Sequence, residues 1–83
     1  MALYFLEYDL VKQKNYQPLY DELERLNAKK HLLSAWSFKG QHSGASEAWR
    51  DHFRQFIDAD DRLMVSEVTD WAGTKLLGTP HNT

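Results

Sequence analysis

The stretch YFLEYDL, residues 4–10, decides the fold, because apolar and aromatic side chains fill most of it before acidic residues appear near its end. In the surrounding segment 2–10, apolar residues occupy both alternating faces: Leu3 and Phe5 on one, and Tyr4, Leu6, Tyr8 and Leu10 on the other. A strand that is apolar on both faces is typically central in a sheet and covered on both sides. We therefore expect a central strand at residues 2–10, with the carboxylate of Asp9 near its exit.

Length and composition indicate one ordinary globular domain. The chain has 83 residues, of which 42% are hydrophobic and 27% charged. These values favour a single folded domain with a modest core over a disordered chain. The net charge of −2 lacks the basic excess of a dedicated nucleic-acid binder. The absence of cysteine excludes a disulfide scaffold, a thiolate zinc site and cysteine catalysis.

Hydropathy gives no sign of membrane insertion. No apolar run approaches the roughly 20 residues that a membrane-spanning helix needs. The first residues carry no basic segment ahead of their apolar run, so we do not expect a signal peptide. We expect a cytoplasmic protein without membrane contact.

The rest of the chain alternates between helical and extended patterns. Helical spacing of apolar residues predicts amphipathic helices from Asn15, as N-cap, to about Asn27, and over residues 46–57. Residues 29–40 read as one long strand, or as two strands with a kink near Ser34. Residues 61–69 read as a further strand. We leave open whether Ser43 or Ser46 caps the second helix.

This order of elements predicts an α+β fold. Its closest standard form is the ferredoxin-like βαββαβ sandwich, a mostly antiparallel sheet with two helices on one face. We expect this domain at residues 1–70 and a C-terminal arm at residues 71–83, which packs on the sheet of its own subunit or of a partner. The bare face of the sheet would expose apolar residues, so we expect a homodimer. The residues assigned to that face are Leu3, Phe5, Trp36 and Phe38.

Asp9 is the first candidate site residue. A carboxylate at the exit of a central strand is exposed enough to ionise and fixed enough to position a ligand. In a two-fold dimer, two copies of Asp9 can share a hard cation such as Mg²⁺ or Mn²⁺, which activates water and stabilises a phosphoryl transition state. The alternative is that Asp9 starts a turn or caps a backbone N–H group.

Three short motifs, in order, carry a resemblance to a known family. They are Tyr8-Asp9-Leu10 after the apolar strand, Ser34-Ala35-Trp36, and Asp61-Arg62-Leu63-Met64-Val65. Over residues 2–69 the chain resembles the small CRISPR-associated adaptation proteins, once described as metal-dependent endonucleases. It is similar in the same way to the virulence-associated protein D toxins, which share that fold and are ribonucleases.

The resemblance implies a ferredoxin-like homodimer with Asp9 as the metal-binding carboxylate near the dimer axis and Ser34 nearby as a second catalytic candidate. Mg²⁺ or Mn²⁺ would then support cleavage of RNA or DNA. Two further functions stay open. One is a catalytically inactive dimeric adaptor or inhibitor that binds another protein in phage–host conflict or a toxin–antitoxin pair. The other is a nucleic-acid scaffold without cleavage.

Other chemical motifs favour ordinary structural roles. None of the four histidines has the spacing of a zinc site, and His52, beside Asp51, reads as a solvated surface residue. The acidic run at residues 58–61 departs from a calcium-binding loop and reads as a solvated turn. Trp36 and Phe38 are more typical of a core or an interface than of base stacking.

Overall fold

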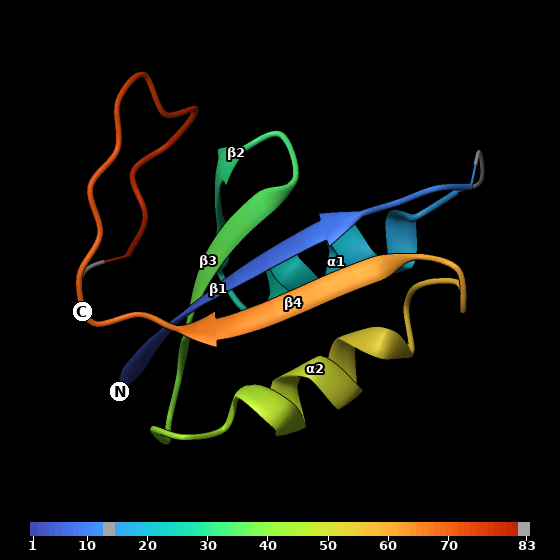
Figure 1. Cartoon of the computed structure of the whole chain (residues 1–83), viewed down its shortest axis with the longest axis horizontal. Helices are drawn as coiled ribbons and strands as arrows, with labels where there is room; N and C mark the ends of the chain where they lie inside the picture. The colour runs from blue at the N-terminus through green and yellow to red at the C-terminus, as the bar shows by residue number, and fades with distance from the viewer. Residues whose placement is uncertain (13–14, 82–83) are drawn as a thin grey trace.

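The computed structural model describes residues 1–12 and 15–81. Its elements are β1 (Ala2–Asp9), α1 (Gln17–Arg25), β2 (Lys29–Leu32), β3 (Ala35–Gly40), α2 (Ser46–Arg54) and β4 (Arg62–Glu67). The strands form one antiparallel sheet in the order β2-β3-β1-β4 (Figure 1). The α+β class with a four-stranded antiparallel sheet and two helices is therefore confirmed, and it is compatible with a ferredoxin-like arrangement. Neither nine-residue helix is long enough to cross a bilayer.

β1 is a central strand, as its two apolar faces predict. It pairs with β3 from Ala2 to Glu7 on one side and with β4 from Tyr4 to Asp9 on the other. Its alternate side chains Tyr4, Leu6 and Tyr8 are all buried in the main core. Because the side-chain period of a strand is two, the residues of β1 that alternate with these three face the opposite side of the sheet.

Both helices cover the same face of the sheet. Phe38 stacks on Tyr4, with ring centroids 5.5 Å apart, and meets Phe53 of α2 edge-on at 5.4 Å. Trp36, two residues earlier on β3 and so on the same face, stacks on Tyr20 of α1 at 6.5 Å. Since Tyr4, Phe38 and Phe53 are all fully buried, this aromatic cluster is the centre of the core.

The prediction that Trp36 and Phe38 lie on the bare face with Leu3 and Phe5 is wrong. The observed register pairs Phe5 with Ser37, so Trp36 and Phe38 point toward the helices. A shift of one residue in register moves every side chain of a strand to the other face. The apolar count of the open face is therefore lower than the sequence suggested, and Phe38 belongs to the core.

The helix caps also differ from the sequence expectation. Tyr16 is the N-cap of α1, although the Asn15 Oδ1 atom accepts a hydrogen bond from the Gln17 N–H group at 2.9 Å. Ala45 is the N-cap of α2. The Ser43 hydroxyl instead donates to Glu67 of β4 at 2.7 Å, which ties the start of α2 to the edge of the sheet.

The described part of the C-terminal arm, residues 71–81, contacts its own sheet. The Leu77 N–H group donates to the carbonyl oxygen of His31 at 3.0 Å, along the outer edge of β2. The His81 N–H group donates to the Ser37 Oγ atom at 3.1 Å, and Pro80 between them is fully buried. Figure 1 shows the arm, orange to red, leaving the end of β4 and turning back on itself. These contacts cover an edge strand that would otherwise offer free backbone groups.

Gly78 permits this close approach, so we expect Gly78→Ala to detach the arm. A Cβ atom at position 78 would lie 2.6 Å from the backbone oxygen of Lys30, which cannot move aside without disturbing β2. Hydrogen exchange at the Leu77 amide should speed up by about tenfold or more. Gly73→Ala is the matched control, because the three atoms nearest to its Cβ would belong to the movable side chain of Leu76 rather than to the backbone. Unchanged protection of the Leu77 amide in Gly78→Ala would contradict this packing of the arm on β2.

Candidate functional site at the end of β1

Asp9 lies at the last rung of the β1–β4 ladder, directly opposite Arg62. Its Oδ2 atom is 3.8 Å from the Arg62 Nη1 atom, and the two side chains are 69% and 77% exposed. Asp9 is thus fixed by the sheet at its Cα while its carboxylate remains open to solvent. This combination of a rigid backbone and a free carboxylate suits ligand binding better than stabilisation of the fold.

An open concavity of about 590 Å³ surrounds Asp9, and Ser34 lines it as well. Ser34 lies in the turn between β2 and β3, and its carbonyl oxygen accepts a hydrogen bond from the Tyr8 N–H group at 3.1 Å. That bond holds the turn against the exit of β1. The structure therefore brings the two candidate residues to one depression, although they are 25 positions apart in the sequence.

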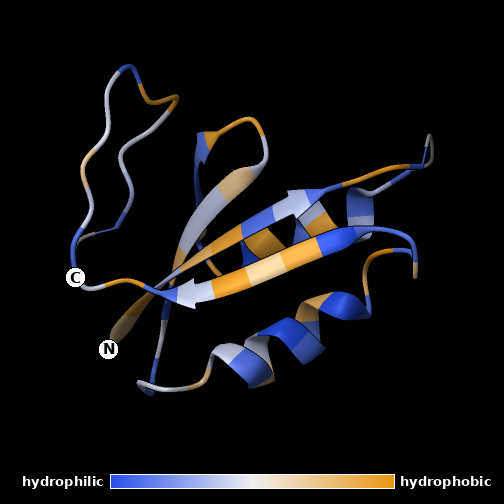
Figure 2. Ribbon diagram, in the orientation of Figure 1, coloured by the Kyte–Doolittle hydropathy of each residue, from blue (hydrophilic) through white to orange (hydrophobic). Residues whose placement is uncertain are grey.

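Exposed apolar side chains form one rim of this concavity. Leu33 is 78% exposed, and Leu32 and Met64 are each more than half exposed. Figure 2 shows the turn between β2 and β3 in the colour of hydrophobic residues, projecting beyond the sheet. We name the surface formed by Leu32, Leu33 and Met64 the apolar rim.

Glu7 is a second carboxylate in the concavity, and it was not among the residues predicted for the site. It precedes Asp9 by two positions, so both side chains lie on the open face of β1. Its cross-strand neighbours are Ala35, which is small, and Met64. The sequence could have indicated Glu7, because side chains two positions apart in a strand lie on the same face and Glu7 is two positions before Asp9.

The carboxylates of Asp9 and Glu7 can supply part of the coordination of a hard divalent cation. Among residues 1–12 and 15–81, no three acidic or histidine side chains converge on a point that could hold a metal. Mg²⁺ nevertheless commonly binds through one or two carboxylates and takes its other oxygens from water and substrate phosphates. Asp9, with Glu7 beside it, supplies that minimal donor set. The donors are all oxygen atoms, which matches Mg²⁺ or Mn²⁺.

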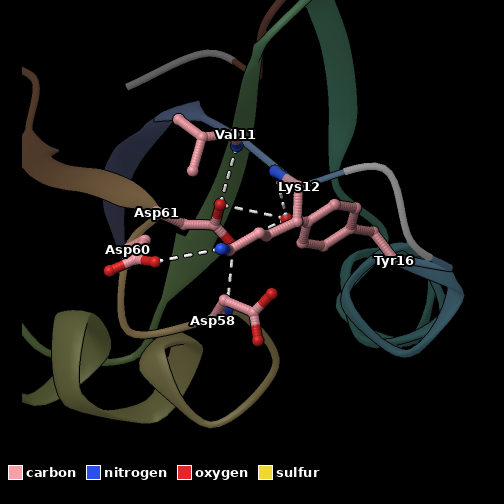
Figure 3. Close-up of polar contacts among 6 residues, drawn as sticks. All are labelled: Val11, Lys12, Tyr16, Asp58, Asp60 and Asp61. Carbon is pink, nitrogen blue, oxygen red and sulfur yellow. Dashed lines mark hydrogen bonds and ion pairs between the residues drawn. The ribbon is translucent and has the colours of Figure 1, made fainter.

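Asp61, also named by the family resemblance, has a different environment. Its Oδ1 atom accepts from the Val11 N–H group at 2.8 Å, its Oδ2 atom accepts from the Asp58 N–H group at 2.8 Å, and the Tyr16 hydroxyl lies within 3.0 Å of both oxygens. Figure 3 shows these bonds converging, together with the ion pair of Lys12 and Asp60 at 3.1 Å. Asp61 thus connects the exit of β1, the start of α1 and the loop before β4.

The turn at residues 58–61 is therefore more than a solvated loop. Burial and the Asp61 carboxylate raise the pKa of the Tyr16 hydroxyl, which keeps it protonated as a donor. A carboxylate that accepts this many hydrogen bonds has little capacity left for a ligand. We assign Asp61 a structural role. Its partners could not be predicted from local sequence patterns because they are up to 50 positions away.

His52 is the second residue whose surroundings differ from the sequence expectation. Its Nε2 atom lies 2.5 Å from the Glu22 Oε2 atom, which joins α2 to α1. Arg25 donates two hydrogen bonds to the same carboxylate, at 2.7 and 2.6 Å. The Glu22 side chain is only 10% exposed, and these bonds lower its pKa to about 2, with Arg25 the largest cause. The cluster links the two helices on the far side from Asp9.

We expect this link to make the stability of the protein dependent on acid pH. Because the folded-state pKa of about 2 lies below the usual 4.5, the ionised carboxylate stabilises the fold above pH 4.5, and this contribution is lost as pH falls toward 2. Glu22→Gln should lower the free energy of unfolding at pH 7 by about 1–2 kcal/mol and flatten that acid slope. Urea titrations at several pH values measure both. Glu24→Gln, on the exposed side of α1, should change neither.

No protein-family model matches the chain, and no solved structure matches it. The interpretation of the site therefore depends on the geometry of its residues. The resemblance carried by Tyr8-Asp9-Leu10 and the other two motifs stays a prediction.

Proposed function

We propose that the protein is a cytoplasmic, ferredoxin-like homodimer that cleaves phosphodiester bonds of RNA or DNA with the help of Mg²⁺ or Mn²⁺ held by Asp9. The observation that carries this proposal is the exposed Asp9 carboxylate in a concavity that also contains Ser34. The resemblance to the CRISPR-associated adaptation proteins and virulence-associated protein D toxins supports the same function.

In this mechanism the residues of the chain position the cation and the substrate. A hard cation would supply stabilisation of the charge that develops on the phosphoryl oxygens and would activate water as the nucleophile. Asp9 would hold that cation at the end of β1, with Glu7 on the same face as a neighbouring carboxylate. Ser34, held against β1 through the Tyr8 N–H group, would offer a hydroxyl to the substrate.

A second copy of the chain is the occupant we propose for the apolar rim. Each subunit presents a carboxylate, Asp9, and a cation, Arg62, beside the exposed side chains of Leu33 and Met64. A two-fold axis through the apolar rim would match apolar surface to apolar surface and would leave Asp9 and Arg62 beside the contact. It would also add a second Asp9 to a site that one subunit supplies only sparsely.

A catalytically inactive dimeric adaptor or inhibitor that binds another protein is the second candidate. The net charge of −2 and the two acidic residues in the concavity oppose phosphate binding, while the apolar rim favours a protein partner. This function keeps the dimer and dispenses with the cation.

Asp9→Ala should reduce Mn²⁺- or Mg²⁺-dependent cleavage of labelled RNA and DNA more than about 100-fold, because the charge stabilisation supplied through a bound ion is worth several kcal/mol. The fold should survive, since the side chain is largely exposed. Asp60→Ala removes a similarly exposed carboxylate outside the concavity and should keep wild-type cleavage. Wild-type protein that cleaves no nucleic acid with either metal would end the nuclease proposal and leave the adaptor.

Leu33→Lys should convert the dimer to a monomer, because it places a charge at the centre of the proposed contact. Light scattering of the purified protein at micromolar concentration gives the mass directly. Val11→Lys is the control, since Val11 is an exposed apolar residue that does not line the concavity. A monomeric wild type, or a Leu33→Lys variant that stays dimeric, would contradict this interface.

A further inference from the structure

Arg62 differs from Arg25 and Arg50 in how its guanidinium is held, and from Arg54 in lining the concavity. Arg25 donates two short hydrogen bonds to Glu22, and Arg50 donates two to Asp51. Among the described residues, Arg62 has one charged neighbour, Asp9, at 3.8 Å, which is longer than a hydrogen bond. Its N–H donors therefore remain available to a ligand.

The pair of Asp9 and Arg62 does little for stability. Exposed ion pairs of this kind contribute about 0–1 kcal/mol, and this one is loose. The register nevertheless fixes both Cα atoms opposite each other, so the guanidinium is kept within reach of the concavity that Ser34 and Tyr8 also line. A cation held near a site without a tight internal partner is suited to binding an anion.

The hydrogen-bonding geometry of arginine favours a phosphate as the anion. A planar guanidinium binds two oxygens of one phosphate through parallel N–H groups, which a lysine ammonium cannot do. The concavity is open and shallow, so it fits a chain passing across the surface better than an enclosed small molecule.

We infer that Arg62 is a phosphate-contacting residue that binds the backbone of a single-stranded nucleic acid crossing the concavity beside Asp9. This inference rests on the proposed function, because it names the substrate contact of the same site. Asp9 and Arg62 then have separate roles, one toward a cation and the other toward a phosphodiester. The contact is independent of base identity, since it reaches only the backbone.

Binding without a metal isolates this contact. The experiment uses the full-length Asp9→Asn protein in EDTA, so that no carboxylate at position 9 competes for Arg62, with a fluorescein-labelled oligothymidylate as the probe. We expect the double variant Asp9→Asn/Arg62→Ala to bind more weakly, and the slope of log K against log salt to fall by about 0.7, as one lost single-strand phosphate contact requires. Arg62→Lys should keep most of the slope but bind more weakly than arginine.

Arg54→Ala in the same background is the matched control, because Arg54 is an exposed arginine on α2 with a similarly long ion pair, to Asp51 at 3.8 Å. Its affinity and salt slope should match those of the parent. An Arg62→Ala variant with an unchanged slope, or a parent protein that does not bind the probe, would overturn the inference. Mn²⁺ titration of the wild type against Asp9→Asn tests the cation separately, so a failed metal site and a failed phosphate contact give different results.

Discussion

The pairing of β1 with both β3 and β4 is the constraint on which the rest of the structure depends. It fixes which side chains of three strands face the helices, and so it assembles Tyr4, Phe38 and Phe53 into one aromatic core. A slip of one residue would place Glu7 in that core and Tyr4 in solvent. The same register sets Asp9 opposite Arg62 at the end of the ladder, so the core and the candidate site are consequences of one alignment.

The fold class was predictable because its signals are local. The apolar residues on both faces of segment 2–10 indicate a buried central strand. Helical spacing around Leu19 and Leu23, both fully buried, indicates an amphipathic helix. The register of β3 against β1 was not predictable, because α1 and β2 lie between these two strands in the chain and no short hairpin sets their alignment. A difference of one residue in that alignment exchanges the two faces of β3, and this is why Trp36 and Phe38 were assigned to the wrong side.

The site was predictable to a similar extent. Asp9 could be found because an acid at the end of an apolar strand is out of place, and Ser34 entered through the family resemblance. Arg62 and Glu7 could be assigned to the site only once the structure of the sheet was known. Arg62 comes from a neighbouring strand, and Glu7 joins the site because it shares a face of β1 with Asp9. The arm was the least predictable part. Its attachment depends on backbone contacts at Gly78 and Leu77 that no side-chain pattern encodes.

Two aspartates at the same end of the sheet, Asp61 and Asp9, differ in how much the fold depends on them. Asp61 is surrounded by donors, from Val11, Tyr16 and Asp58, and its removal would leave those groups without their acceptor. Within the described part of the chain, Asp9 has one loose ion-pair partner and a mostly exposed side chain, so the fold gains little from its charge. A carboxylate that the fold does not need, held on a rigid strand in a concavity with a second acid and an arginine, is where binding chemistry has room to act.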